Sequence, residues 1–343
     1  MLRNLTLLAL AALVSAPVMA QERDVEGDER AGTAAAQYLL VPTTARTAAL
    51  GNSLTGGLSN LSGIEALQSN PAALMSNQGT NAQFSRMEYV ADIGVNTFGV
   101  AQRFGNNNVA LSVTSWDYGD IPLTTAESSD PTSLTFDAST TIVGGSYARA
   151  FTDRISAGVT VKLASEQIDD MNGGAVAFDA GMTYTVGESG LRFGVSLKNF
   201  GTKVNYGGNG LRQFIDLDPN DETGFPTVVD AESYELPSLL NFGASYTQSF
   251  AGDLSVAAMG NFRSNSYDQP EFAGGLEVGY ANLIHARAGV NIVPEPDQTA
   301  WEMWSVGAGI NVPVSNSAIG VDYTYRQMEF FDQVHMFSVG LGF

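Results

Sequence analysis

The sequence lacks cysteine altogether and has only three lysines, Lys162, Lys198 and Lys203, among its 343 residues. Without cysteine the chain cannot form a disulfide framework, a zinc–thiolate site or a lipid anchor on an N-terminal cysteine. Lysine and arginine together number 16 against 36 aspartate and glutamate residues, and the formal net charge is −20. Because binding to phosphates needs basic patches, nucleic acid is excluded as a class of partner.

Long hydrophobic runs are also scarce. The apolar run Leu5–Val14 follows Arg3 and precedes small residues that end at Ala20, which is the pattern of a secretory signal peptide. This run is far shorter than the ~20 apolar residues of a membrane-spanning helix. We therefore expect residues 1–20 to be a cleaved export signal. A mature chain without a spanning helix is either soluble or crosses a membrane as a closed β-barrel.

What the sequence does have is alternation with a period of two residues. In the stretch LRFGVSLK at 191–198, every second residue is large and apolar. Such alternation gives a strand one apolar and one polar face, and the runs average near the roughly 9–11 residues of a tilted membrane-crossing strand. Fourteen runs of this kind occur, at about 81–88, 92–103, 108–122, 134–150, 154–167, 174–185, 190–201, 237–249, 253–263, 270–280, 283–293, 301–312, 316–328 and 332–343.

The connections between these runs alternate in length. Every second one is tight, such as GNNN at 105–108 and GESG at 187–190, and the intervening ones tend to be longer, up to 201–237. This arrangement is typical of bacterial outer-membrane barrels. The sequence thus predicts an all-β fold, a 14-stranded antiparallel transmembrane β-barrel at residues 80–343, integral to the outer membrane and surrounded by its lipid. A soluble β-sandwich is the competing fold.

Aromatic residues are expected where such a barrel meets the two surfaces of the membrane. The aromatic residues next to the short turns are Phe104, Phe151, Tyr184, Phe250, Tyr280 and Phe343. Three tryptophans, Trp116, Trp301 and Trp304, lie toward the long-loop ends of their strands.

The polar rows of the strands carry a nearly balanced set of charges. We expect nine residues to face the lumen: Lys162, Asp179, Arg192, Lys198, Glu277, His285, Arg287, Asp322 and Arg326. The acidic residues in excess over the basic ones therefore lie in the N-terminal tail and the long loops, which predicts an anionic outer surface. The lumen charges fit a selective pore lining, or salt bridges between the wall and an internal plug, and we favour the salt bridges.

Residues 21–79 do not alternate and are partly apolar, which favours an N-terminal tail and plug over a periplasmic linker. The residues that we single out here are Ala45, Arg46, Leu50, Gly51, Asn70, Pro71 and Ala72. Asn70 precedes Pro71, and asparagine followed by proline is typical of the start of a helix.

Two motifs in this region carry a family resemblance. QYLLVPTTARTAALG (Gln37–Gly51), followed by NPAAL (Asn70–Leu74), resembles the N-terminus of the PorV/PorQ outer-membrane proteins. That family is similar in architecture to the FadL-type fatty-acid transporters, which also carry an N-P-A box in a plug. The segments Tyr147–Ile168, Ala177–Tyr184 and Gly190–Gly201 look like the same family. The family fold implies the same number of strands.

The resemblance implies two functions. As a PorV/PorQ-like protein, the chain is a non-enzymatic component of type IX-like protein secretion or surface attachment. Its extracellular loops then contact secretion-system subunits or secreted cargo. The chain lacks, however, the large extracellular inserts expected of a PorV protein that binds cargo. As a FadL-like protein, it transports hydrophobic small molecules across the outer membrane. We take the first as the main hypothesis and the second as the alternative.

Motifs for catalysis and metal binding are weak. There is no G-x-S-x-G, no H-E-x-x-H and no Cys/His cluster, and a structural role for His285 is favoured over a triad assembled in space. No catalytic residue and no cofactor is predicted. Asp216, Asp218 and Asn220 match the opening of a calcium loop, but Asp221 replaces its turn glycine, so a solvated acidic loop is favoured.

The last strand ends HMFSVGLGF, with Phe337, Val339, Leu341 and Phe343 in one row. We expect this row to face lipid and the strand to pair with the first strand, leaving no open edge. A terminal phenylalanine on such a strand also resembles the insertion signal that the barrel assembly machinery recognises.

Overall fold

The computed structural model describes residues 33–61, 63–124, 134–215, 225–250, 253–294, 303–328, 331 and 333–343. The expected signal peptide, Trp301 and the calcium candidates Asp216, Asp218 and Asn220 lie outside the described residues.

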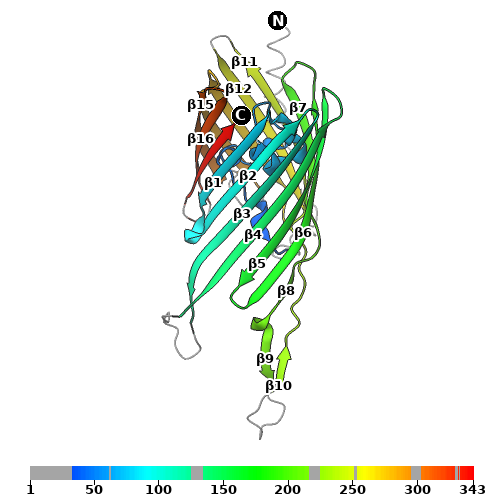
Figure 1. Ribbon diagram of the computed structural model, residues 1–343, viewed down its shortest axis with the longest axis vertical. Helices are drawn as coiled ribbons and strands as arrows, with labels where there is room; N and C mark the ends of the chain where they lie inside the picture. Colours follow the sequence, from blue (N-terminus) through cyan, green and yellow to red (C-terminus); the bar gives the residue numbers. More distant parts are fainter. Residues whose placement is uncertain are drawn as a thin grey trace.

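Fourteen antiparallel strands form one closed barrel (Figure 1), as the alternation predicts. Strands β1 to β7 and β11 to β17 pair in chain order, and β1 closes the barrel on β17 from Asn81↔Gly342 to Glu88↔His335. The wall strands are β1 (Thr80–Glu88), β2 (Gly94–Phe104), β3 (Asn107–Pro122), β4 (Thr135–Ala150), β5 (Ile155–Ile168), β6 (Met171–Thr185), β7 (Leu191–Gly201), β11 (Leu239–Ser249), β12 (Leu254–Asn265), β13 (Glu271–Tyr280), β14 (Ile284–Ile292), β15 (Met303–Val314), β16 (Ser317–Arg326) and β17 (Val334–Gly342).

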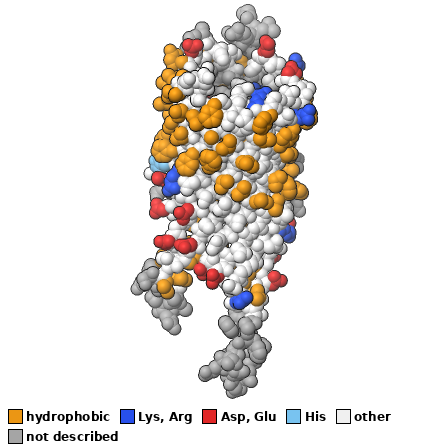
Figure 2. All heavy atoms as spheres, viewed as in Figure 1, with side chains coloured by type: hydrophobic (Ala, Val, Ile, Leu, Met, Phe, Trp, Pro, Cys, Tyr) orange, Lys and Arg blue, Asp and Glu red, His pale blue; other side chains and the backbone are white. Residues whose placement is uncertain are grey.

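Strand β7 shows why these sequences form a barrel wall. Phe193, Val195 and Leu197 point outward and are 46%, 37% and 40% exposed, whereas Gly194 and Ser196 point inward and are buried. Large apolar side chains alternate with inward-facing residues in this way around the barrel. Figure 2 shows the resulting band of apolar side chains on the outer wall. Acidic groups lie beyond this band, toward the long loops. The outer surface is therefore apolar where a soluble protein would be polar.

The connections follow the predicted asymmetry with one exception. Strands β5 and β6 are joined at the long-loop end by only Asp169 and Asp170, because both strands run further than the alternation indicated. Beyond the end of β7, strand β6 instead pairs with the short strand β8 (Asn205–Gly208).

The region predicted as a single long loop, 201–237, contains regular structure. It holds β8, the 3₁₀ turn η6 (Asn209–Leu211), and a hairpin of β9 (Arg212–Ile215) with β10 (Phe225–Val228). These strands have four residues each, which is too short for an alternation pattern to be seen in the sequence. Figure 1 shows this hairpin projecting well beyond the barrel.

The expected position of Trp116 at a membrane surface is wrong. Trp116 lies inside the barrel, is 2% exposed, and packs against Tyr38, Tyr89 and Tyr118. The reason is its register: Trp116 shares the inward row of β3 with Ser112 and Thr114, while Leu111 and Val113 point outward.

The described residues that precede β1 run through the interior of the barrel as a chain of short helices and turns (Figure 1). These are η2 (Gln37–Leu40), α2 (Ala45–Ala49), η3 (Leu54–Gly56), α3 (Gly63–Ser69) and η4 (Pro71–Ser76). We call Ala34–Asn77 the interior segment. Within the described residues, no helix is both long enough and apolar enough to span a membrane.

Candidate functional site

The interior segment sits directly against the wall because the wall offers glycines at the contact points. A Cβ atom added to Gly194 would lie 1.9 Å from the Thr55 carbonyl oxygen, and one on Gly289 would lie 2.2 Å from the Gly51 nitrogen. Gly51 itself has φ +61°, a conformation that glycine adopts without strain. The backbone of the interior segment therefore packs directly on the backbone of the wall, and no channel passes between segment and wall at these points.

Asn70, Pro71 and Ala72 fix one turn of the interior segment to β5, β6 and β7. The Asn70 side chain accepts a hydrogen bond from the Ala72 nitrogen at 3.0 Å and so caps η4. Its Nδ2 donates to the carbonyl oxygens of Thr55, Met182 and Val195, at 3.0, 3.2 and 3.3 Å. Asn70 is fully buried, so these bonds satisfy an amide that has no access to water.

Helix α2 is held by hydrogen bonds to β16 and β17. The Ala45 nitrogen donates to Ser338 Oγ at 2.9 Å, and Thr324 Oγ1 donates to the Ala45 carbonyl oxygen at 2.6 Å. Leu50 follows the helix, is fully buried, and belongs to the apolar cluster that joins the interior segment to β12. Four of the residues singled out in the sequence, Ala45, Leu50, Asn70 and Ala72, thus make structural contacts inside the barrel.

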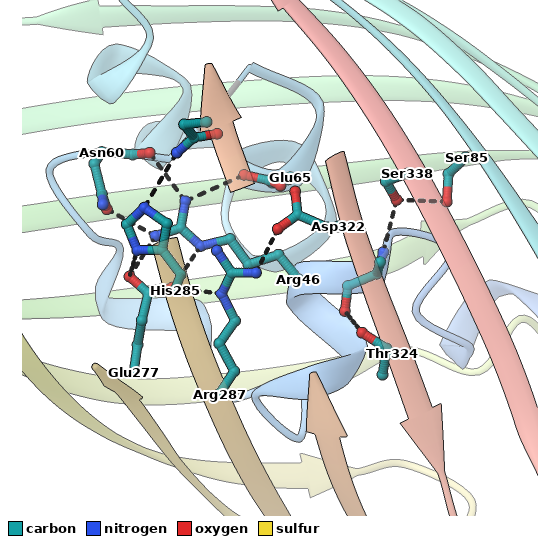
Figure 3. A network of polar contacts seen from close by, with 12 residues as sticks. Arg46, Asn60, Glu65, Ser85, Glu277, His285, Arg287, Asp322, Thr324 and Ser338 are labelled. Carbon is teal, nitrogen blue, oxygen red and sulfur yellow. Dashed lines mark hydrogen bonds and ion pairs between the residues drawn. The ribbon is translucent and has the colours of Figure 1, made fainter. Parts of the chain in front are cut away.

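Arg46 joins the interior segment to the wall through a buried network of charges (Figure 3). Its Nε and Nη2 donate to the Glu277 carboxylate at 2.9 and 2.7 Å, and Glu65 lies 3.5 Å from Nη1. Burial alone would lower the pKa of Arg46, but the carboxylates of Glu277 and Glu65 outweigh burial and raise the pKa above its ordinary value. The guanidinium therefore stays charged at every physiological pH.

The network continues along the wall from Glu277. Arg287 donates to Glu277 Oε2 at 2.6 Å and also pairs with Asp322. His285 lies 4.0 Å from Glu277 and contacts Asn311 at 3.1 Å. No serine hydroxyl is hydrogen-bonded to the His285 ring in the described part of the chain, so the arrangement provides no activated nucleophile there.

Two more predicted lumen residues have no part in this network. Arg192 lies 3.4 Å from the Ser76 hydroxyl at the end of η4, and Arg326 approaches the Met303 sulfur at 3.6 Å. The remaining three, Lys162, Asp179 and Lys198, lie together on another part of the wall.

Lys162, Asp179 and Lys198 gather at an irregularity between β6 and β7. The pairing register shifts between Phe178 and Ala180, so that two residues of β7 face one of β6. Asn199, with φ +56°, is the extra residue and turns inward. Asp179 pairs with Lys162 at 2.5 Å and accepts a hydrogen bond from the Asn199 nitrogen at 2.8 Å. Asn199 cannot be recognised from the sequence pattern, because a bulge changes the alternation by a single residue.

A cavity of about 90 Å³ lies between the interior segment and the wall next to this bulge. The apolar part of the lining comes mainly from the interior segment, and the wall contributes hydroxyl groups of β2, β3 and β5 together with Lys162 and Lys198. Its lining residues are Tyr38, Leu39, Leu40, Val41, Pro42, Thr43, Asn52, Ile64, Leu67, Gln68, Thr97, Ser112, Thr114, Ile142, Gly144, Thr160, Lys162 and Lys198.

Two further cavities extend from the first toward the long-loop end. A small one of about 10 Å³ shares Leu39, Leu40 and Lys198 with it, and one of about 290 Å³ lies where β11 begins and β12 ends. Leu40 lines all three. The three cavities therefore lie next to one another along the interior segment, from the long-loop end inward.

No group of side chains suited to a metal ion occurs among the described residues.

No protein-family model matches the chain, and no curated protein matches its sequence. Solved structures do match. The CymD monoaromatic hydrocarbon channel superposes with a TM-score of 0.56 at 13% identity, over 89% of this chain and 98% of CymD. A Pseudomonas aeruginosa FadL homologue superposes with a TM-score of 0.52 at 14% identity, over 88% of this chain and 98% of the homologue. The Pseudomonas putida toluene transporter TodX superposes with a TM-score of 0.51 at 12% identity, over 87% of this chain and 96% of TodX.

The chain therefore has the fold of the FadL-like barrels. At these identities the comparisons establish the fold alone, and they do not show the PorV/PorQ relationship that the N-terminal motifs suggest.

Proposed function

We propose that the protein is a non-enzymatic channel of the outer membrane for small solutes with a hydrophobic body. The observation that carries this proposal is the set of three neighbouring cavities that all have Leu40 in their lining. The fold of hydrocarbon channels and the exposed apolar band of the wall also support it. Signal-directed export and insertion through the row that ends at Phe343, which is 56% exposed, belong to the same proposal.

The interior segment acts in this proposal as a plug that a solute must pass. The glycine contacts and the Arg46–Glu277 pair hold the segment at the barrel wall. The bulge of β6 and β7 interrupts the regular pairing beside the first cavity. A solute that reaches the first cavity would leave through this irregular part of the wall or through movement of the interior segment.

Filling the first cavity tests the proposal. Thr114 lines the cavity, and its neighbour Val113 points outward and is 42% exposed. In cells that depend on this chain for uptake, Thr114→Trp should lower the rate of toluene entry roughly tenfold, because the indole occupies the space of the solute. Val113→Trp is the matched control and should leave entry unchanged. Equal rates for both variants and the wild type would contradict the proposal.

A secretion or surface-attachment role is the second candidate, because the hairpin of β9 and β10 projects beyond the barrel as a binding surface would. Replacing residues 209–229 by a short glycine linker should then change which proteins co-purify with the barrel and leave toluene entry intact. An unchanged set of partners would count against this role.

A further inference from the structure

Arg86 is a basic residue in the lipid-facing row of β1. Ser85 and Met87 are buried inside the barrel, whereas Phe84, Arg86 and Glu88 point outward and are exposed. A charge in such a row costs free energy where it faces the hydrocarbon core, and much less where it reaches the membrane surface. An arginine in this row therefore needs a counter-charge or a route to water.

The position of Arg86 is close to the outer surface of the membrane. The ladder between β1 and β17 ends at Glu88↔His335, one outward position beyond Arg86. On the neighbouring strands the His335 ring meets Tyr325, and Tyr325 packs on Trp304 with ring centroids 5.5 Å apart. Aromatic residues on the outer wall of a barrel mark the membrane interface. Figure 2 shows basic and histidine side chains at the long-loop edge of the apolar band, with acidic groups beyond them.

The guanidinium of Arg86 has no counter-ion. Its Nη1 donates to Oδ1 of Asn96, the facing residue on β2, at 3.1 Å, and this amide is neutral. No carboxylate in the described part of the chain forms an ion pair with Arg86, not even Glu88 in the next outward position. The group extends toward the long-loop end, since a Cβ on Gly94 would lie 3.4 Å from Nη2 and Gly94 pairs with Glu88. Long basic side chains extend in this way toward the lipid headgroups.

An apolar surface adjoins the guanidinium. Phe337 faces Arg86 across the β1–β17 ladder, and Phe84 faces Phe98 across the β1–β2 ladder, on the short-turn side of Arg86. All three rings are exposed on the outer wall. The surface thus offers rings for acyl chains to contact and a cation at the outer end of those rings. The planar fork of a guanidinium matches two oxygens of a phosphate group.

We infer that Arg86 binds the phosphate of a phosphorylated lipid in the outer leaflet, whose acyl chains lie along Phe84, Phe98 and Phe337. The charge of the site is complementary to the phosphate, and the apolar rings are complementary to the chains. Free phosphate uses only the first of these, so the lipid is the favoured ligand. The inference concerns the outside of the barrel and is independent of the proposed channel function.

The test compares two lipids with the same acyl chains, dimyristoyl phosphatidic acid and dimyristoylglycerol. Native mass spectrometry measures their binding to the purified full chain in a non-ionic detergent, with a chelator present so that no divalent cation bridges phosphate and carboxylate. Phosphatidic acid should bind roughly tenfold more tightly, because a charge-assisted hydrogen bond contributes about one decade in affinity. Equal affinities of the two lipids, or displacement of phosphatidic acid by an equal concentration of inorganic phosphate, would overturn the inference.

Variants locate the site. Arg86→Gln should lose roughly tenfold in affinity for phosphatidic acid and none for dimyristoylglycerol, and the second result shows that the variant is folded. Arg86→Lys should keep part of the affinity, because lysine supplies the charge without the planar fork. Lys203→Gln is the matched control on the long-loop side, since the Lys203 side chain is 54% exposed and pairs with Glu235. Unchanged binding in Arg86→Gln, or an equal loss in Lys203→Gln, would overturn the assignment.

Glu88 provides a test of opposite sign. Its carboxylate occupies the next outward position of β1 and repels a phosphate held at Arg86. Glu88→Gln should therefore raise the affinity for phosphatidic acid about threefold and leave that for dimyristoylglycerol unchanged. A weaker binding of phosphatidic acid to Glu88→Gln would contradict the placement of the phosphate beside Arg86.

Discussion

At the scale of single residues, the most consequential group is Arg46. It is 5% exposed and bonds to Glu277, which lies 231 residues further along the chain. Buried charges are tolerated when they are paired and hydrogen-bonded, and removing one partner leaves the other uncompensated. The pair therefore determines where α2 sits on the wall more than it adds to net stability.

Arg46→Gln should destabilise the protein by about 3 kcal/mol, because Glu65 and Glu277 lose a shared buried cation. Denaturant-induced unfolding in detergent measures the change, and faster proteolysis within the interior segment should accompany it. The matched control is Arg154→Gln, whose partner Asp153 has a side chain 85% exposed. Surface pairs of this kind contribute about 1 kcal/mol or less, so equal losses in the two variants would refute the role of Arg46.

At the scale of elements, the interior segment and the wall strands depend on each other. The segment has short helices of at most seven residues, and helices this short are not stable alone in water. Their backbone is held by wall glycines, by Asn70 and by hydroxyl groups of β16 and β17. The strands in turn would enclose an unfilled lumen without the segment.

Gly194→Ala tests this dependence. The new methyl group would lie 1.9 Å from the Thr55 carbonyl oxygen, so either the segment or β7 must shift, at a cost of about 1–3 kcal/mol. Hydrogen exchange of the interior segment should then accelerate. Gly260→Ala, in which the nearest atom to the new Cβ is 3.9 Å away, should be neutral or slightly stabilising. Slow exchange in both variants would show that the close contact is unimportant.

At the scale of the whole molecule, charge and apolar surface are separated. The formal charge of −20 is concentrated away from the apolar band, as the acidic groups toward the long loops in Figure 2 indicate. The field of such a surface repels anions that approach the mouth. A solute must pass this barrier before it reaches the cavities inside the barrel.

Salt should therefore affect association more for an anion than for a neutral solute. Raising the ionic strength from about 0.01 M to about 0.15 M shortens the Debye length from about 30 Å to about 8 Å. The association rate of valerate, an anion, should rise on the order of threefold, and that of 1-pentanol, a neutral solute of the same length, should not change. Stopped-flow measurement of both probes decides the matter, and a rate for valerate that falls with salt would contradict this picture.

The barrel follows from the pattern of the sequence alone. The two-residue period, which depends only on neighbouring side chains, predicted fourteen strands, and the structure confirms them. The alternation does not reveal β8, β9 and β10, because these strands have four residues each. The position of Trp116 along β3 suggests a membrane surface, but its row in the strand places it inside the barrel.

Which lumen residues meet depends on how the barrel closes. It paired Arg46 with Glu277, placed Asn199 at a bulge beside Asp179, and left Lys198 facing a cavity without a carboxylate. The physical reason is that alternation is a local property, whereas contacts inside a barrel depend on closure. Closure brings the β1 and β17 edges together, fixes the register of every strand, and so sets which side chains share the enclosed space.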